Sequence, residues 1–242
     1  MAATPRHVLN SHLRSMENDV LFHIGLTCSA EEKQRVVDLF GDVKFFVTGG
    51  SAERMTQFAA SVAEALGIAT PFGYSLAPIG STSRYVLFKV GPMEAIHEVP
   101  VLGDIQRRPA ICTKQVTDEI TQSAEELQLP YAVGKTLTCN DFYEGQGRLD
   151  GAICEYTAED KMNFLQHASA HGVKNIEMEA RGFAAFCYKL KIPVAVVCVT
   201  LLNRLNGDQV LSSHETLKSY EERPAAVLLH YIKKKVAAAQ KP

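Results

Sequence analysis

Short apolar segments alternate along this chain with longer amphipathic ones. The strand-like segments are 42–50, 83–92, 174–178 and 194–202, and the helix-like segments are 51–67, 157–172, 179–191 and the region after about Glu215. Apolar strands separated by helical crossovers are typical of a largely parallel sheet that helices cover on both faces. The alternation therefore predicts an α/β fold, and a length of 242 residues fits one large domain or a tight pair.

Capping residues set the expected ends of two of these helices. Ser51 is expected to cap the helix that Gly67 ends. Thr157 and Asp160 have the spacing of a capping box, in a helix that Gly172 ends.

Two predicted strands stand too close together for a parallel crossover. Between the strand that ends in KVGP at position 92 and the segment EVPVLG (98–103) there are only the five residues MEAIH. A parallel crossover needs about a dozen residues or more. These strands are therefore either antiparallel, or the chain that once joined them is missing.

Charge and composition exclude several classes of partner. The formal net charge is -2 and the pI is near 6.4, which gives no electrostatic reason to expect nucleic acid or membrane. The basic stretch IKKKV (232–236) lies in a helical pattern and is expected on a solvated face. The first residues lack the apolar stretch that a signal peptide contains, so no signal peptide is expected. The apolar run 192–202 is shorter than the roughly 20 residues that span a bilayer. Six cysteines without a C-x-x-C pair fit reduced thiols in a cytosol.

A glycine-rich loop, FYEGQGRLDG at 142–151, raises the question of phosphate binding. A dinucleotide fingerprint fails because its third glycine comes one residue late and because the next residues, AICEY, have the pattern of a strand. Alternatively, Gln146 and Arg148 could hydrogen-bond the edge of a pyrimidine-2,4-dione while Phe142 lies against the ring. A third possibility is an ordinary loop that carries a surface Gln and Arg.

Two further segments could bind parts of a substrate. The segment FVTGGSAERM (46–55) runs from a strand through a glycine turn into a helix, where Arg54 indicates either a bound anion or a surface pair with Glu53. Glu177 and Glu179 lie at the carboxyl end of the expected strand 174–178 and could bind vicinal hydroxyls, or they could cap the next helix. His167 and His171 lack the glutamate of a zinc-hydrolase motif and are expected on a helix surface.

Taken together, several of these stretches resemble the animal-type uridine phosphorylases of the nucleoside phosphorylase-I family. The matching pieces are LFGDVKFFVTGGSAERM, SRYVLFKVGP, FYEGQGRLDG, GVKNIEMEA, VVCVTLLNRLNGDQV and the tail YIKKK. The resemblance covers most of the chain and implies a single domain, 1–242, with a three-layer α/β/α fold around a largely parallel, mixed central sheet.

The resemblance also implies roles for individual residues. The uracil-binding residues would be Phe142, Gln146, Arg148, Leu201, Leu202 and Val210; the ribose-binding residues would be His23, Glu177, Met178 and Glu179; the phosphate-binding residues would be Gly50, Arg54 and Arg84. Gln146 and Arg148 would be the catalytic pair, since they stabilise the leaving uracil anion. The implied reaction is the reversible phosphorolysis of uridine to uracil and ribose 1-phosphate. It needs no metal or organic cofactor, only inorganic phosphate as co-substrate.

The implied assembly and location follow from the same resemblance. His23 and Arg84 would be lent by a neighbouring subunit, which implies a homodimer with shared active sites. The family works in the cytoplasm on small molecules, with neither nucleic acid nor membrane as a partner.

The chain departs from the family pattern at the short join near 92–98. Relatives carry there about 60 further residues, on the order of two βαβ units, which include the principal phosphate Arg and a phosphate Thr. The expectation is an internal deletion that removes central strands and leaves neighbouring strand edges unpaired. An alternative function is therefore a catalytically impaired, splice-type variant that binds uridine or uracil, or that pairs with full-length subunits, without turnover.

Overall fold

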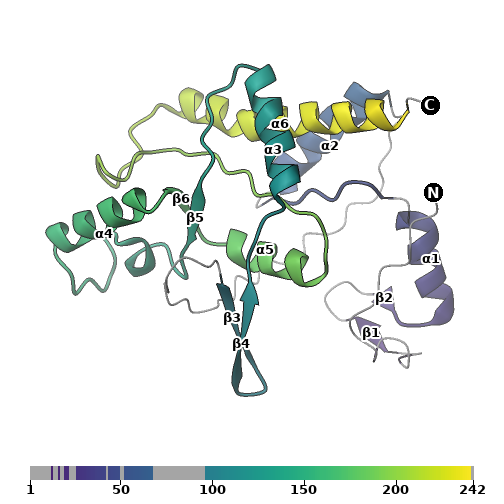
Figure 1. Ribbon diagram of the computed structural model, residues 1–242, viewed down its shortest axis with the longest axis horizontal. Coiled ribbons are helices and arrows are strands. Elements are labelled where there is room, and N and C mark those ends of the chain that lie inside the picture. Colours follow the sequence, from purple (N-terminus) through teal and green to yellow (C-terminus); the bar gives the residue numbers. More distant parts are fainter. Residues whose placement is uncertain are drawn as a thin grey trace. The chain divides into compact units, whose positions relative to one another are not determined.

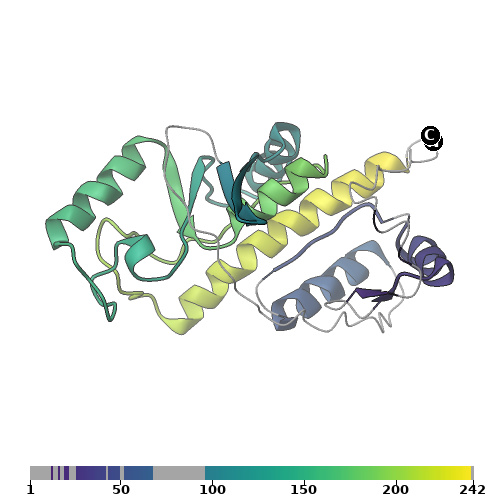
Figure 2. The same ribbon diagram turned by 90° about the horizontal axis from the view of Figure 1, so that it is seen from below.

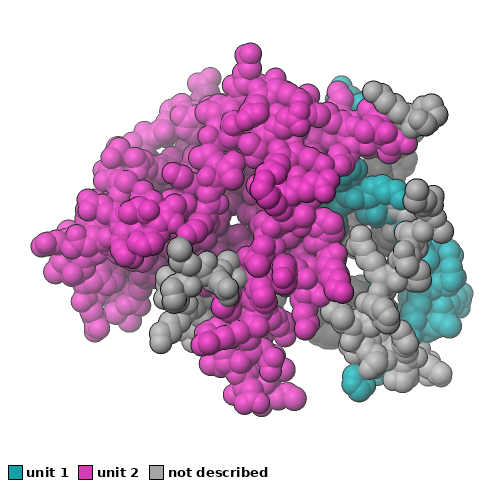
Figure 3. Space-filling view, viewed as in Figure 1, with its two compact units in different colours: residues 1–83 teal, residues 84–242 magenta. Residues whose placement is uncertain are grey.

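The computed structural model describes residues 12, 16, 19–21, 26–41, 43–49, 52–67 and 96–240. The chain divides into two compact units, residues 1–83 and residues 84–242, which Figure 3 colours separately. A single domain over 1–242 stays a prediction. The predicted strand 83–92 and most of the join near 92–98 lie outside the described residues.

The first unit contains a small hairpin and two helices. Strands β1 (Val20–Leu21) and β2 (Leu26–Thr27) pair antiparallel, and α1 (Ala30–Phe40) and α2 (Ala52–Leu66) follow. Helix α1 begins after Ser29, whose hydroxyl accepts a hydrogen bond from the Glu32 amide at 3.1 Å. Helix α2 ends at Gly67 with φ of +64°, as its sequence predicts.

A β-hairpin opens the described part of the second unit. Strands β3 (Ile96–Val101) and β4 (Asp104–Pro109) pair antiparallel through a two-residue turn (Figure 1). Both turn residues, Leu102 and Gly103, have positive φ values of 52° and 91°, which suits the right-handed twist of the paired strands. The segment 98–103 therefore pairs with the chain that follows it.

A parallel βαβ unit carries the glycine-rich loop. Strand β5 (Lys135–Thr138) lies beside β6 (Val173–Glu177), and between them run the one-turn helix η2 (Glu144–Gln146) and α4 (Ala158–Ala170) (Figure 1). The predicted capping box is present: Thr157 Oγ1 accepts from the Asp160 amide at 3.1 Å, and Asp160 accepts from the Thr157 amide at 2.9 Å. Helix α5 (Ala180–Lys189) follows β6 and packs on β3, β4 and β5.

Two long-range ion pairs join α3 (Lys114–Glu126) to the last helix, α6 (His214–Ala239). Lys234 contacts Glu126 at 2.6 Å and Lys235 contacts Glu119 at 3.1 Å, so these lysines of the IKKKV stretch are only partly exposed. Figure 2 shows α6 as one continuous helix that passes through Pro224. Among the described residues, no helix combines the length and apolar character that crossing a bilayer requires.

The predicted central sheet is not formed in the described part of the chain. That part contains three two-stranded sheets, and neither 43–49 nor 194–202 is a strand, although both have strand-like sequences. Val194 instead exchanges hydrogen bonds with Thr113, at 2.7 and 3.0 Å. The segment AICEY, which also has a strand pattern, is irregular. Strands need backbone partners along their edges, so the α/β class is confirmed while the continuous parallel sheet is absent among these residues.

The second unit has a small apolar core, and several of its large apolar side chains are exposed. Its core cluster consists of the small residues Ala110, Ala184 and Ala185 with Cys112 packed against them. Large apolar side chains such as Ile105 and Phe186 are exposed. A missing layer of strands would leave this kind of uncovered apolar surface.

Candidate active site

The loop after β5 buries both of the polar side chains that its sequence singles out. Gln146 ends η2, and Gly147 follows in the left-handed conformation, with φ of 63° and ψ of 37°. The Tyr143 carbonyl accepts from the amides of Gln146 and Arg148, at 3.1 and 2.9 Å. Gln146 is 6% exposed and Arg148 7% exposed, so the alternative of a surface Gln and Arg is wrong.

The Arg148 guanidinium is held on two sides. It lies over the Phe142 ring, with its central carbon 4.0 Å from the ring centroid, and its Nη1 donates to the Asp208 carbonyl at 3.0 Å. Arg148 Nε is buried and has no hydrogen-bond partner among the described residues. A buried, unpartnered donor is costly, and a substrate carbonyl oxygen is the kind of acceptor that would satisfy it.

The loop satisfies its own backbone amides and so leaves no phosphate cradle. The Asp141 carboxylate accepts from the amides of Tyr143 at 2.7 Å and Gly145 at 2.9 Å. A Cβ on Gly145 would lie 2.8 Å from this carboxylate. A side chain at position 145 would therefore displace the Asp141 carboxylate, and the chain's own Asp141 fills the position of an anion.

Three residues that the sequence analysis did not select form a buried ion cluster beneath this loop. Lys161 Nζ contacts Asp208 Oδ2 at 2.7 Å, and Arg204 Nε contacts Asp208 Oδ1 at 2.9 Å. The side chains of Lys161, Asp208 and Arg204 are 9%, 12% and 10% exposed, respectively. Arg204 Nη2 also donates to the Gln146 carbonyl at 2.9 Å. The spacing of Arg204 and Asp208 in NRLNGD was a signal for such a pair.

Opposite effects act on the carboxyl group of Asp208. Burial acts to raise its pKa, while the hydrogen bonds from Lys161 and Arg204 lower it, and the net result is a pKa below the ordinary aspartate value. Asp208 is therefore ionised at neutral pH, within a cluster that has two cations for one carboxylate.

The residues predicted to form the apolar wall of the base site flank Arg204 and Asp208 in the sequence. Leu201 and Leu202 are half-buried, whereas Val210 is exposed. All three belong to the irregular segment that contains Arg204 and Asp208.

The glutamate that ends β6, Glu177, and the glutamate two residues later, Glu179, have different environments. Glu177 Oε2 accepts from the amides of Glu179 and Ala180, both at 2.6 Å, and Glu177 Oε1 accepts from the Thr138 hydroxyl. Glu177 therefore caps α5, which is the second of its two predicted alternatives. Met178 is half-buried and Glu179 is exposed, and the Glu179 carboxylate has no hydrogen bond within the described part of the chain. Of the two carboxylates, Glu179 is the one that is open to a ligand.

The cysteines near β5 and β6 are unsuited to nucleophilic catalysis. Burial raises the pKa of Cys139 to about 12. Although Cys198 is an exposed residue, desolvation of its thiol and the nearby Glu177 carboxylate raise its pKa to about 11. Both thiols are protonated at neutral pH, and the thiolate is the reactive form.

The predicted phosphate residues are only partly described. Arg54 is exposed in the first turn of α2, in the first unit. Gly50, Arg84 and the ribose residue His23 lie outside the described residues. These assignments stay predictions.

The described residues include no group of three metal-binding side chains. His167 and His171 are exposed, as predicted, and their rings lie 4.1 Å apart with His171 Nδ1 2.8 Å from the His167 carbonyl oxygen.

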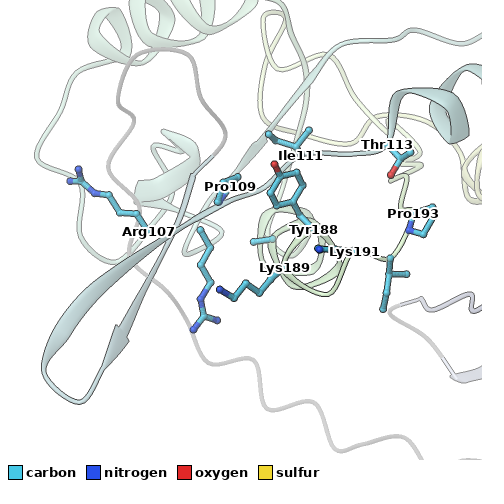
Figure 4. A pocket seen from close by; sticks show the side chains of 11 residues that line it. Arg107, Pro109, Ile111, Thr113, Tyr188, Lys189, Lys191 and Pro193 are labelled. Atoms are coloured by element: carbon cyan, nitrogen blue, oxygen red, sulfur yellow. The ribbon is translucent and has the colours of Figure 1, made fainter. Parts of the chain in front are cut away.

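A cleft of about 590 Å³ lies elsewhere in the second unit, between β4 and the end of α5 (Figure 4). Its lining includes Arg107, Ile111, Tyr188 and Lys189, and it contains none of the predicted substrate residues. Arg107 is paired with Glu98 at 2.9 Å and is largely exposed. Size alone does not make this cleft the active site, because the buried polar groups converge at the loop 142–151.

Substituting Gly147 by Ala tests the geometry of the loop. The left-handed conformation costs a non-glycine residue about 1–2 kcal/mol, so we expect a lower free energy of unfolding and weaker uracil binding. Thermal unfolding and titration calorimetry measure both. Gly172, with φ of 85° and open space around its position, provides the matched control: G172A should lower stability similarly but leave uracil binding unchanged. Equal uracil binding in both variants would contradict this account of the loop.

Comparisons with known proteins place the chain among relatives. Residues 81–233 match the phosphorylase superfamily. Uridine phosphorylase 1 of Mus musculus is 34% identical over 291 residues, covering 95% of this chain and 93% of the relative. A structure from work on two uridine phosphorylases of the oomycete Phytophthora capsici is 56% identical, with a TM-score of 0.81, covering 98% of this chain and 100% of that chain. Inactive uridine phosphorylase B of Schistosoma mansoni is 30% identical, covering 96% of this chain and 97% of the relative.

Proposed function

This chain belongs to the phosphorylase superfamily, and on that premise we propose that it is a uridine phosphorylase. The reaction is the reversible phosphorolysis of uridine to uracil and ribose 1-phosphate, as in pyrimidine nucleoside salvage. The observation that carries the proposal is the burial of Gln146 and Arg148 side by side in one loop, in a chain 34% identical to a mouse uridine phosphorylase.

The proposed chemistry places developing negative charge on the base. A phosphate oxygen attacks C1′ of the ribose as the bond from C1′ to the base nitrogen breaks, and the electron pair of that bond leaves with uracil. Gln146 and Arg148 donate to the base and stabilise the anion as it forms, in a site where burial strengthens the interaction. The buried Nε of Arg148, which has no hydrogen-bond partner among the described residues, supports its role as a donor.

The remaining proposed contacts surround the sugar and the phosphate. Glu179 accepts hydrogen bonds from the ribose hydroxyls, and its open carboxylate supports this. Glu177 shapes this segment as the cap of α5, beside Met178. Gly50, Arg54 and Arg84 bind phosphate, and His23 contacts the ribose. Leu201, Leu202 and Val210 form the apolar wall of the base site. Phosphate serves as co-substrate, and no resident cofactor is needed.

We further propose a cytoplasmic homodimer with shared active sites. The six free cysteines suit a reducing compartment. The exposed apolar side chains Leu102 and Ile105 of the β3–β4 hairpin suit a contact surface.

The short join supports a second candidate, a variant that binds uridine or uracil without turnover. The 291-residue match to the mouse relative is longer than the whole of this chain, so the relative carries residues that this chain lacks. We propose that these include the principal phosphate ligands, near 92–98. A relative named as inactive is also part of the family.

Calorimetry together with a turnover assay separates the candidates. A uridine phosphorylase binds uracil and releases it from uridine only when phosphate is present. Uracil binding without release at any phosphate concentration would favour the non-catalytic variant. If the chain neither binds uracil nor releases it from uridine, and circular dichroism shows a folded protein, both candidate functions are wrong.

A further inference from the structure

The ion cluster under the base-binding loop fastens three separate segments of the chain. Lys161 comes from α4, Arg204 and Asp208 come from the irregular segment before α6, and Gln146 and Arg148 come from the loop itself. The contacts are short, between 2.7 and 3.0 Å, and all the side chains involved are about nine-tenths buried. A buried cluster of this kind fixes geometry, because its members have few other partners.

Asp208 is the common partner of the cluster. Its two carboxylate oxygens accept from Lys161 and Arg204, and its backbone carbonyl accepts from Arg148 Nη1. The Arg204 that it holds donates onward to the Gln146 carbonyl. One residue thus connects to both members of the predicted catalytic pair, Gln146 and Arg148, although it is about 60 residues away from them in sequence.

We infer that Asp208, itself held by Lys161, is a positioning residue that orients Arg148 toward the leaving uracil. The inference rests on the proposed function. Asp208 and Lys161 would then affect the reaction through Arg148. Neither of their side chains would contact the substrate.

The charge balance predicts the direction of the effect. Arg148, Arg204 and Lys161 bring three positive charges together, and Asp208 supplies the carboxylate that the last two share. Asp208→Asn keeps the size of the side chain but leaves the cations uncompensated in a buried site, which is strongly unfavourable. We expect Lys161 and Arg204 to move apart, and the carbonyl that holds Arg148 to move with them.

A double-mutant cycle tests the coupling. D208N is expected to weaken uracil binding at least tenfold in calorimetry, and K161M is expected to weaken it less. The double variant K161M/D208N should bind uracil more tightly than D208N alone, because it removes one uncompensated cation. D118N is the matched control: Asp118 forms an exposed pair with Lys114, so its loss should not change uracil binding. A double variant whose loss equals the sum of the single losses would overturn the inference.

A change of leaving group separates positioning from a general loss of structure. 5-Fluorouracil is a more acidic leaving group than uracil and needs less stabilisation as an anion. If Asp208 acts through Arg148, D208N should lower kcat several-fold more with uridine than with 5-fluorouridine. An equal loss with both substrates would show that Asp208 only maintains the fold.

The inference can also fail separately from the proposed function. If the unmodified chain neither binds uracil nor releases it, the proposed function fails. A crystal structure of D208N tests the positioning step by itself: an unmoved Arg148 guanidinium overturns the inference whatever the activity of the unmodified chain, and a displaced one supports it only in a chain that binds uracil.

Discussion

Replacing Arg148 by Met is expected to lower kcat/KM for uridine by a factor on the order of 10² to 10³, the usual cost of losing one preorganised donor to a developing anion. Met approximates the length of the arginine side chain and can still pack on Phe142, but it cannot donate to the base. Steady-state kinetics at saturating phosphate measure the effect. Thermal unfolding should show that the variant is still folded.

Two comparisons sharpen this prediction. Arg148→Lys keeps the charge but loses the planar donor geometry, so its activity should lie between those of the original chain and R148M. Arg107→Met removes an exposed arginine of the β3–β4 hairpin and should leave kcat/KM unchanged. If kcat/KM of R148M for uridine is within threefold of that of the original chain, Arg148 is not a catalytic residue.

Lengthening the short join near 92–98 is expected to have the second large effect, if the proposed deletion is real. Inserting the corresponding residues of the mouse relative between Pro92 and Glu98 should raise phosphate affinity by about 10²- to 10⁴-fold, because two restored ligands each contribute about 1.5–3 kcal/mol in hydrogen bonds to a charged group. It should also give partners to the strand-like segment 194–202, which has none of the strand pairing that its sequence predicts. The dependence of turnover on phosphate concentration and the content of β-structure by circular dichroism measure the two effects.

The control for this graft is the same insertion with its phosphate arginine replaced by alanine. This variant should recover the β-structure but not the phosphate affinity. If the graft changes neither property, the short join is not a deletion scar.

The sequence predicted those features that depend on residues close together in the chain. The Thr157–Asp160 capping box and the glycines that end α2 and α4, Gly67 and Gly172, are local patterns, and they occur where expected, whereas the predicted cap Ser51 lies outside the described residues. The role of Gln146 and Arg148 at a pyrimidine edge stays a prediction, although both side chains are buried. The contact between Gly145 and the Asp141 carboxylate was not predictable, since it exists only in the folded loop.

Features that depend on distant residues were missed or incorrectly predicted. The Lys161–Asp208–Arg204 cluster joins residues more than 40 positions apart, and only the Arg204–Asp208 spacing signals it. The segments 42–50 and 194–202 have strand-like sequences, but a strand forms only when another strand lies beside it. Apolar character predicted the tendency of these segments, but residues 43–49 and 194–202 have no partner strand among the described residues.

Phosphorus NMR of the unmodified chain with uridine and inorganic phosphate tests the central claim most directly. Phosphorolysis predicts a growing ribose 1-phosphate signal that matches the uracil released, mole for mole, and no uracil when phosphate is omitted. Uracil that appears without ribose 1-phosphate, or no uracil at any phosphate concentration from a folded protein, would contradict the assignment of this chain as a uridine phosphorylase.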